Sequence, residues 1–249
     1  MSYESKVKNE ELRAKNEELP SGWQLTNEVR RPKGPKATHH SQLTTKVGLF
    51  GGSFNPVHKG HTALAAYICE QGLVDEVWMM VSPQNPLKRN LELLDENERL
   101  HMMQLAVAPY PKLKACDFEF HLPRPSYTHH TLQALREAYP NHEFSLIIGE
   151  DNWTHFGRWY RSEDILRETS IIVYPRDTEE SLELRVKGLE SHPDDNSQLT
   201  THNSQLTTPL QLFPYSSTQV RNAIAEGKDT SDMLHPDVEA YIREKGFYR

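Results

Sequence analysis

The sequence predicts an α/β fold in which helices cover both faces of a doubly wound parallel β-sheet. Short apolar runs typical of buried strands alternate along the chain with longer segments of helical periodicity. The first run, Lys46–Phe50, leads directly into Gly51 and Gly52 and then into a predicted helix. Because parallel strands need crossover connections of this kind, the alternation favours a parallel sheet over an antiparallel one.

The predicted strands share a run of large apolar residues bounded by turn residues: Lys46–Phe50, Glu76–Val81, Lys114–Phe118, Glu143–Ile148, Ser170–Tyr174 and Leu210–Phe213. The predicted helices lie between and after these strands: Thr62–Glu70, Glu96–Ala108, Thr128–Ala138, Ser162–Arg167, Glu179–Leu189, Thr218–Glu226 and Pro236–Lys245. This order predicts a Rossmann-like sheet whose ligand lies at the carboxyl ends of the strands.

The folded domain is expected to cover residues 46–249, after an extension at 1–45 that is predicted to be disordered. Residues 1–46 carry nine Lys or Arg and six Asp or Glu, without an apolar face that could pack against a core. The word SQLTT occurs three times, at 41–45, 197–201 and 204–208. Each copy offers one large apolar residue, so the copies are interpreted as low-complexity linkers, and residues 191–208 as an insertion in the domain.

Composition excludes several classes of function. A formal net charge of −7 argues against a nucleic-acid-binding protein that relies on overall positive charge. An RNA-binding role for the basic extension lacks interleaved aromatic residues. No apolar run is long enough to span a membrane, and the N-terminus lacks the apolar core of a signal peptide. Cys69 and Cys116 form no disulfide framework, so we expect a cytoplasmic protein whose two thiols are small buried side chains.

The stretch GGSFNPVHKGH at 51–61 carries the strongest functional signal. Gly51, Gly52, Ser53 and Phe54 follow the first predicted strand, where glycine lets a ligand approach the backbone. A helix is expected to begin near Lys59–His61, and its unpaired N–H groups favour phosphate. The stretch matches neither the P-loop pattern GxxxxGK[ST] nor the dinucleotide pattern GxGxxG. We therefore interpret it as a phosphate site of another kind.

His58 and His61 lie three residues apart at the start of that helix. A zinc site needs three or four protein ligands, and no second Cys/His cluster of suitable spacing follows in the sequence. A purely structural pair is an alternative. The interpretation we favour is that both imidazoles donate to phosphate oxygens and stabilise the charge that develops in a transition state.

On these residues, GSFNPVHKGH resembles the signature of the HxGH-motif nucleotidyltransferase superfamily. A second stretch, YSSTQVR at 215–221, resembles the SSTxxR element of the same superfamily. Ser217 and Thr218 would lie at a helix N-terminus, and Arg221 would lie one turn further on, where its guanidinium can bind phosphate oxygens. Alone, SSTQVR could be an ordinary helix cap, but paired with HKGH it predicts a second wall of a phosphate site.

The rest of the domain resembles the bacterial nicotinate-nucleotide adenylyltransferases. The resemblance rests on PSYT at 125–128, IGED at 148–151, WY at 159–160, VYPR at 173–176 and HPDVEAYIREKGFYR at 235–249. It covers about residues 46–249, apart from the insertion at 191–208. The stretch NPLK at 85–88 lacks the histidine of the PPHK-like pattern of that family.

The resemblance implies three sets of site residues. The catalytic set is His58, His61 and Arg221. The set that would bind ATP and its phosphates is Gly51, Gly52, Ser53, Phe54, Ser217, Thr218, Gly149 and Asp151. The set that would bind the nicotinate nucleotide is Asn85, Lys88, Tyr127, Thr128, Trp159, Tyr160 and Arg176. Within it, Trp159 would stack on the pyridine ring, and Thr128 and Tyr160 would lie around its carboxylate.

The implied activity is adenylyl transfer from ATP to nicotinate mononucleotide, which gives deamido-NAD and pyrophosphate. The implied cofactor is Mg²⁺, carried mainly by ATP, without a metal site built by the protein. One alternative is a sister enzyme such as phosphopantetheine adenylyltransferase, which does not call for PSYT, GED and a stacking tryptophan. A second is a non-catalytic nucleotide sensor, although all the motif histidines and Arg221 are present. Preference for the acid or the amide mononucleotide, and homo-oligomer formation, are left open.

Overall fold

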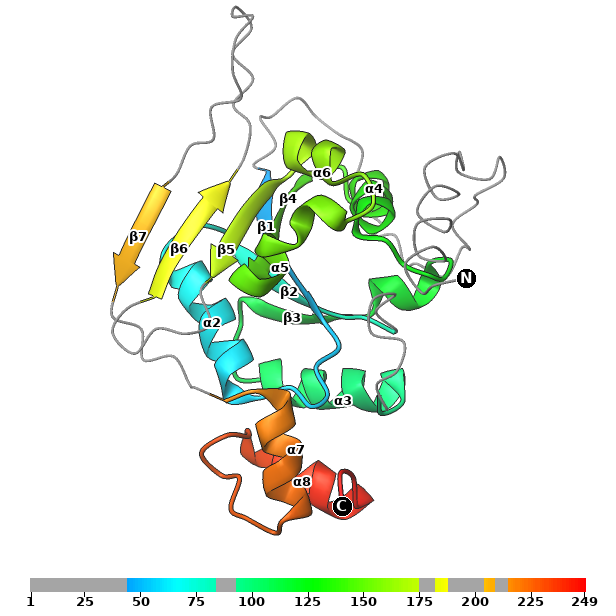
Figure 1. Ribbon diagram of the computed structural model, residues 1–249, viewed down its shortest axis with the longest axis vertical. Helices are drawn as coiled ribbons and strands as arrows, with labels where there is room; N and C mark the ends of the chain where they lie inside the picture. The colour runs from blue at the N-terminus through cyan, green and yellow to red at the C-terminus, as the bar shows by residue number, and fades with distance from the viewer. Residues whose placement is uncertain (1–43, 84–92, 175–181, 188–203, 209–214) are drawn as a thin grey trace, which may run out of the picture.

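The computed structural model describes residues 44–83, 93–174, 182–187, 204–208 and 215–249. Within them, seven strands form one sheet in the order β3-β2-β1-β4-β5-β6-β7 (Figure 1). The strands are β1 (Thr45–Gly52), β2 (Glu76–Val81), β3 (Leu113–Cys116), β4 (His142–Gly149), β5 (Ser170–Tyr174), β6 (Leu182–Lys187) and β7 (Ser204–Thr208). Strands β1 to β5 are parallel, which confirms the predicted doubly wound α/β fold.

The sheet is mixed rather than wholly parallel, because β6 pairs antiparallel with β5 and β7 pairs antiparallel with β6. The helix expected at Glu179–Leu189 is wrong, since residues 182–187 form β6. Their sequence, LELRVK, alternates apolar and polar residues with the period of two that suits a strand. The SQLTT copy at 204–208, interpreted as linker, instead forms β7, whose backbone pairs with that of β6 along one edge. The strand expected at Leu210–Phe213 lies outside the described residues.

The helices are α2 (Lys59–Glu70), α3 (Glu96–Val107), α4 (Thr128–Ala138), α5 (Glu150–Thr154), α6 (Ser162–Glu168), α7 (Ser217–Ala225) and α8 (Pro236–Lys245). Short 3₁₀ turns occur at η1 (Phe118–His121) and η2 (Phe156–Arg158). The third predicted strand therefore ends at Cys116, two residues earlier than expected. The first helix begins at Lys59, with His58 as its N-cap. This start agrees with the one expected from the GGSFNPVHKGH stretch and lies three residues before Thr62, the start expected from apolar spacing. None of the helices described is long and apolar enough to cross a membrane.

Two hydrophobic cores lie on opposite faces of the sheet, as alternation along the strands requires. Val77, Met79 and Val81 of β2 point into the core that α2 and α3 cover, together with buried side chains of α7 and α8. Trp78 and Met80 of the same strand point into the other core, beneath α4 and α6. Figure 1 shows these two helical layers on either side of the sheet, with α7 and α8 extending the layer of α2 and α3.

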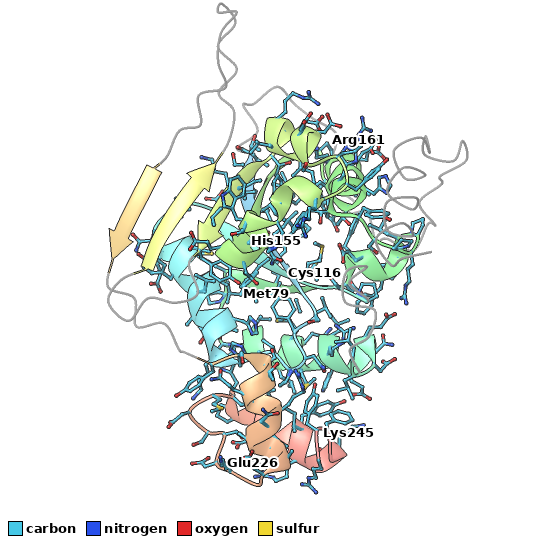
Figure 2. The ribbon with its side chains drawn as sticks, in the orientation of Figure 1. Met79, Cys116, His155, Arg161, Glu226 and Lys245 are labelled. Atoms are coloured by element: carbon cyan, nitrogen blue, oxygen red, sulfur yellow. The ribbon has the colours of Figure 1, made fainter. Side chains whose placement is uncertain are left out.

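Both cysteines are buried side chains with free thiols, as the sequence predicted. Burial raises the pKa of Cys69 to about 11 and that of Cys116 to about 12, so both thiols stay protonated and unreactive near neutral pH. In Figure 2, Cys116 and Met79 lie in the layer of the sheet, between the two layers of helices. These thiols therefore belong to the packing of the sheet.

Close packing at Gly48 of β1 gives a test of this core. A Cβ atom at residue 48 would lie 2.7 Å from Cδ1 of Ile147 and 3.2 Å from Cγ2 of Val77. We expect Gly48→Ala to lower the free energy of unfolding by about 1–3 kcal/mol, as overpacked cores do, measured by urea denaturation. Ile147→Val removes Cδ1, so the same substitution should cost less in that background. An equal cost in both backgrounds would show that this contact is not the cause.

Candidate active site

The candidate site lies where the carboxyl ends of β1 and β4 meet. These neighbouring strands are joined in parallel register, and the chain leaves them toward opposite edges of the sheet: β1 leads to β2 and β3, whereas β4 leads to β5. In doubly wound folds this switch point is where ligands bind, because the strand ends leave a crevice there. The GGSFNPVH stretch leaves β1 at this point, and Gly149 and Asp151 leave β4.

The segment that follows β1 is tightly constrained. Phe54 has a positive φ of 43°, which costs about 1–2 kcal/mol for a residue other than glycine. Its buried ring meets the ring of Phe50 edge to face at 5.7 Å between centroids and that of His61 at 5.0 Å. A Cβ at residue 52 would approach the Phe54 ring to 3.1 Å, so glycine makes room for this ring.

His58 and His61 are brought together at the start of α2. Their ring centroids are 3.7 Å apart, and the two rings are tilted by 30°. The backbone N–H of His58 donates to Nδ1 of His61 at 3.2 Å. Because Nδ1 accepts this hydrogen bond, a neutral His61 carries its proton on Nε2, which can then donate to a ligand. His58 itself is buried, at 5% exposure.

The SSTQVR stretch is tied directly to the residues that follow β1. Helix α7 begins at Ser217, whose hydroxyl donates to the carbonyl of Pro56 at 2.9 Å. Arg221 donates to the carbonyl of Asn55 at 2.7 Å and to the hydroxyl of Thr218 at 3.2 Å. Two motifs that are more than 150 positions apart in the sequence are therefore in direct contact. Each of them contains the N-terminus of a helix, α2 or α7.

On the β4 side, Gly149 provides room for a carboxylate at the switch point. A Cβ at residue 149 would lie 2.5 Å from Oδ1 of Asp151, so the Asp151 side chain folds back over the end of the strand. Tyr174, at the end of β5, also approaches this position, since its Cζ would lie 3.3 Å from the same Cβ, and its ring meets that of Phe50 at 5.7 Å between centroids. An acceptor carboxylate therefore lies at the carboxyl end of a central strand.

The residues expected to bind a pyridine ring lie on the face of the sheet covered by α4 and α6. Tyr127 is the N-cap of α4, Thr128 is the first residue of that helix, and the rings of Tyr127 and Tyr160 are 5.1 Å apart. Trp159 is half-buried and rests on Phe156, with ring centroids 5.3 Å apart. The fold thus brings Tyr127, Thr128 and Tyr160 into one cluster, with Trp159 adjacent to Tyr160 in the chain.

Two histidines that sequence reasoning did not single out complete this cluster. His129 and His130 stand in the first turn of α4, and their rings lie 6.0 and 5.1 Å from that of Tyr160. Burial lowers the pKa of both imidazoles, and neighbouring cationic groups lower it further. Arg161, which adds to this effect, is labelled near α4 and α6 in Figure 2. The sequence signal that could have identified these two residues is the pair HH directly after PSYT.

Three predicted site residues, Asn85, Lys88 and Arg176, lie outside the described residues.

A cavity lined by Arg136, His142, Glu168 and Ser170 does occur among the described residues. It lies at the amino ends of β4 and β5, opposite the end at which His58 and His61 stand. The chemistry of the motifs, rather than this cavity, therefore defines the candidate site. The described part of the chain has no group of three or more His, Cys, Asp or Glu residues that could hold a metal ion.

Two further residues that the sequence did not single out hold the segment after β1. Arg99 of α3 is almost completely buried, and its guanidinium donates to the carbonyls of Ser53 and Ser82. Tyr248, next to the C-terminus, donates to the side-chain carbonyl of Asn55 at 2.8 Å. Burial lowers the pKa of Arg99 and raises that of Tyr248, which favours the protonated phenol as a donor.

Comparison with known proteins identifies the family of this chain. Residues 49–223 match the cytidylyltransferase-like family. A "probable nicotinate-nucleotide adenylyltransferase" of Bacteroides thetaiotaomicron is 49% identical over 80% of this chain and 91% of its own length. One of Flavobacterium johnsoniae is 42% identical over 82% of this chain and 99% of its own length.

A solved structure supports the fold alone. Plasmodium falciparum nicotinic acid mononucleotide adenylyltransferase, complexed with NaAD, superposes with a TM-score of 0.61 at 19% identity, over 82% of this chain and 97% of that one. The match over residues 49–223 and the two bacterial relatives at 49% and 42% identity are more specific. The chain therefore belongs to the cytidylyltransferase-like family and, within it, to the nicotinate-nucleotide adenylyltransferases.

Proposed function

We propose that this protein transfers the adenylyl group of ATP to nicotinate mononucleotide, giving deamido-NAD and pyrophosphate. The observation that carries the proposal is the junction of the two phosphate motifs, in which Arg221 and Ser217 of α7 donate to the carbonyls of Asn55 and Pro56. These contacts hold the start of α7 against the segment that leads to His58 and α2. Helix N-termini, imidazoles and a guanidinium are groups that suit a triphosphate. The relatives at 42–49% identity are named for the same reaction.

The reaction needs positioning and charge stabilisation more than proton transfer. The phosphate of the mononucleotide is already anionic at neutral pH, so it can attack the α-phosphorus of ATP without a strong general base. Pyrophosphate then leaves from the opposite side, in line with the attack. The protein's part is to hold both phosphates at this geometry and to stabilise the charge that spreads over the oxygens.

His58, His61 and Arg221 are proposed to supply that charge stabilisation. Nε2 of His61 donates to a phosphate oxygen at the reacting centre, because Nδ1 is occupied by the N–H of His58. Arg221, with Ser217 and Thr218 at the start of α7, holds the β- and γ-phosphates that depart as pyrophosphate. The backbone from Gly51 to Phe54 lines the same space at the end of β1.

The nicotinate nucleotide is proposed to bind on the side of Tyr127, Thr128 and Tyr160. Trp159 covers one face of the pyridine ring, and the N–H groups at the start of α4 donate to its carboxylate. On the ATP side, Asp151 accepts from an adenosine hydroxyl at the end of β4. Asn85, Lys88 and Arg176, outside the described residues, are proposed to complete the contacts with this nucleotide.

Mg²⁺ is proposed as the cofactor, bound mainly by the phosphates of ATP. The imidazole, guanidinium and N–H groups described here suit phosphate oxygens, whereas Mg²⁺ prefers carboxylate oxygens and water. These protein groups would therefore bind the phosphates, and the phosphates would bind the ion. When bound, the ion neutralises phosphate charge and fixes the conformation of the triphosphate.

The assay for this proposal is pyrophosphate release from ATP and Mg²⁺ with nicotinate mononucleotide, run beside nicotinamide mononucleotide and phosphopantetheine. We expect turnover with nicotinate mononucleotide and slower turnover with the amide, because N–H donors at the start of α4 favour a carboxylate. Turnover with phosphopantetheine alone would identify the sister enzyme. ATP binding without turnover on any of the three acceptors would identify a nucleotide sensor.

A further inference from the structure

The segment Ser53–Asn55 is held by polar side chains from two distant parts of the chain. Arg99 of α3 approaches it from one side, and Tyr248, the penultimate residue, approaches it from another. The same segment leads from β1 to His58 and contains Phe54, one of the residues proposed to line the phosphate site.

Arg99 ties together the segments that leave β1 and β2. It is 1% exposed, and its four hydrogen bonds all end on backbone carbonyls. Nη1 donates to Ser53 at 2.6 Å and to Ser82 at 2.8 Å. Nη2 donates to Pro83 at 3.0 Å, and Nε donates to Leu94 at 2.8 Å. A planar fork with five donors can satisfy several carbonyls at fixed angles, which a lysine cannot do.

The bond from Arg99 to Ser53 also sets the direction of a neighbouring N–H group. The carbonyl of Ser53 and the N–H of Phe54 belong to one planar trans peptide unit, so they point in opposite directions. With the carbonyl directed inward to Arg99, the N–H of Phe54 points away from Arg99. The positive φ of Phe54 is then maintained by its buried ring and by this hydrogen bond.

Tyr248 fixes the other end of the segment. Its hydroxyl donates to Oδ1 of Asn55 at 2.8 Å, and Oδ1 also accepts from the backbone N–H of Leu94 at 3.4 Å. The main-chain carbonyl of Asn55 accepts from Arg221 at 2.7 Å. Leu94 is also a partner of Arg99, so the contacts of Arg99 and Tyr248 form one connected network around Ser53–Asn55.

We propose that Arg99 and Tyr248 are positioning residues for adenylyl transfer. By holding Ser53–Asn55 from two sides, they direct the N–H of Phe54 toward an ATP phosphate. They also fix the carbonyl of Asn55 to which Arg221 donates, and so fix the position of the Arg221 guanidinium. The inference rests on the proposed function, which it deepens. Donors for a developing charge are effective only when their geometry is fixed before the reaction. Loosening the network is therefore expected to lower kcat more than it raises KM.

The test compares Tyr248→Phe with Tyr241→Phe. Tyr241 is a matched control because it stands in α8, in the same C-terminal region, and its hydroxyl donates to Glu98 of α3 rather than to the segment. We expect Tyr248→Phe to lower kcat by about five- to tenfold, with KM for nicotinate mononucleotide within about twofold. Tyr241→Phe should keep kcat within about twofold of the wild type, with a comparable change in Tm. Equal kcat values for the two variants would overturn the inference.

A second measurement keeps this inference separate from the proposed function. With the amide nitrogens of phenylalanine isotopically labelled, the NMR signal of Phe54 is followed while ATP and Mg²⁺ are added. We expect it to shift in the wild type and in Tyr241→Phe, and to shift less in Tyr248→Phe. An unresponsive Phe54 signal in the wild type would overturn the inference even where turnover is normal. Absence of pyrophosphate release by a wild type whose Phe54 signal does respond would instead contradict the proposed function.

Arg99→Lys tests the other half of the network. It keeps the charge but loses the planar fork, so we expect kcat to fall by about 10²-fold. Guanidinium ion added to Arg99→Ala should recover part of the lost turnover, which a general loss of folding would not allow. Wild-type kcat in a folded Arg99→Lys would show that charge alone suffices and would overturn the positioning role of Arg99.

Discussion

Replacing His61 with alanine is expected to lower kcat for pyrophosphate release by about 10²–10³-fold, with KM for ATP changed by less than about threefold. The physical reason is the fixed direction of its donor. Nδ1 accepts from the N–H of His58, so Nε2 carries the proton and is held at the start of α2. A donor placed where charge develops stabilises the transition state more than the bound substrate, and its loss therefore appears in kcat.

Two further variants separate this donor role from packing. The His61 ring packs on that of Phe54 at 5.0 Å, so a loss of activity in His61→Ala could come from movement of Phe54. His61→Phe keeps an aromatic ring but has no donor, and we expect it to be as impaired as His61→Ala. His121→Ala, at a histidine that is 53% exposed in η1, serves as the surface control and should retain wild-type kcat. More than a tenth of wild-type turnover in His61→Phe would rule out the donor role.

Replacing Arg221 with alanine is expected to lower kcat/KM for ATP by about 10²–10³-fold. Two functions are lost together in this variant. The guanidinium no longer faces phosphate oxygens, and its hydrogen bond to the carbonyl of Asn55, which joins α7 to the segment after β1, disappears. Steady-state rates at varied ATP, with nicotinate mononucleotide held at saturation, provide the measurement.

Arg221→Lys distinguishes charge from geometry at this position. Lysine keeps the charge but cannot bind two acceptors with one planar group, so we expect it to remain about tenfold or more below the wild type. Arg243→Ala, at an exposed arginine in α8, should leave kcat/KM unchanged and controls for loss of positive charge near the C-terminus. Wild-type kinetics in Arg221→Ala would contradict the proposed role of Arg221 in binding the phosphates of ATP.

The elements that sequence pattern could predict are those whose signal is local. The buried runs at β1, β2 and β4 each depend on residues a few positions apart, and all three lie where expected. The turn expected at Gly51 and Gly52 comes later, because β1 continues through both glycines. The helix expected at 182–187 is wrong for a tertiary reason. LELRVK contains leucine and glutamate, which favour helices, but its alternation fits the free edge of β5. The available edge, which is a tertiary feature, decided between the two.

For the candidate site too, the sequence determined some features and the tertiary structure determined the others. Sequence by itself determined the chemical groups: glycines at the end of a buried strand, two histidines at a helix start, and a Ser-Thr-Arg helix start near the C-terminus. Tertiary structure alone decided that Arg221 reaches the carbonyl of Asn55, that Tyr248 reaches its side chain, and that Arg99 is buried among carbonyls. Local pattern reports which way a residue faces within its own helix or strand. It cannot report which partner 17 to 193 positions away will satisfy a donor, because that depends on how the whole chain packs.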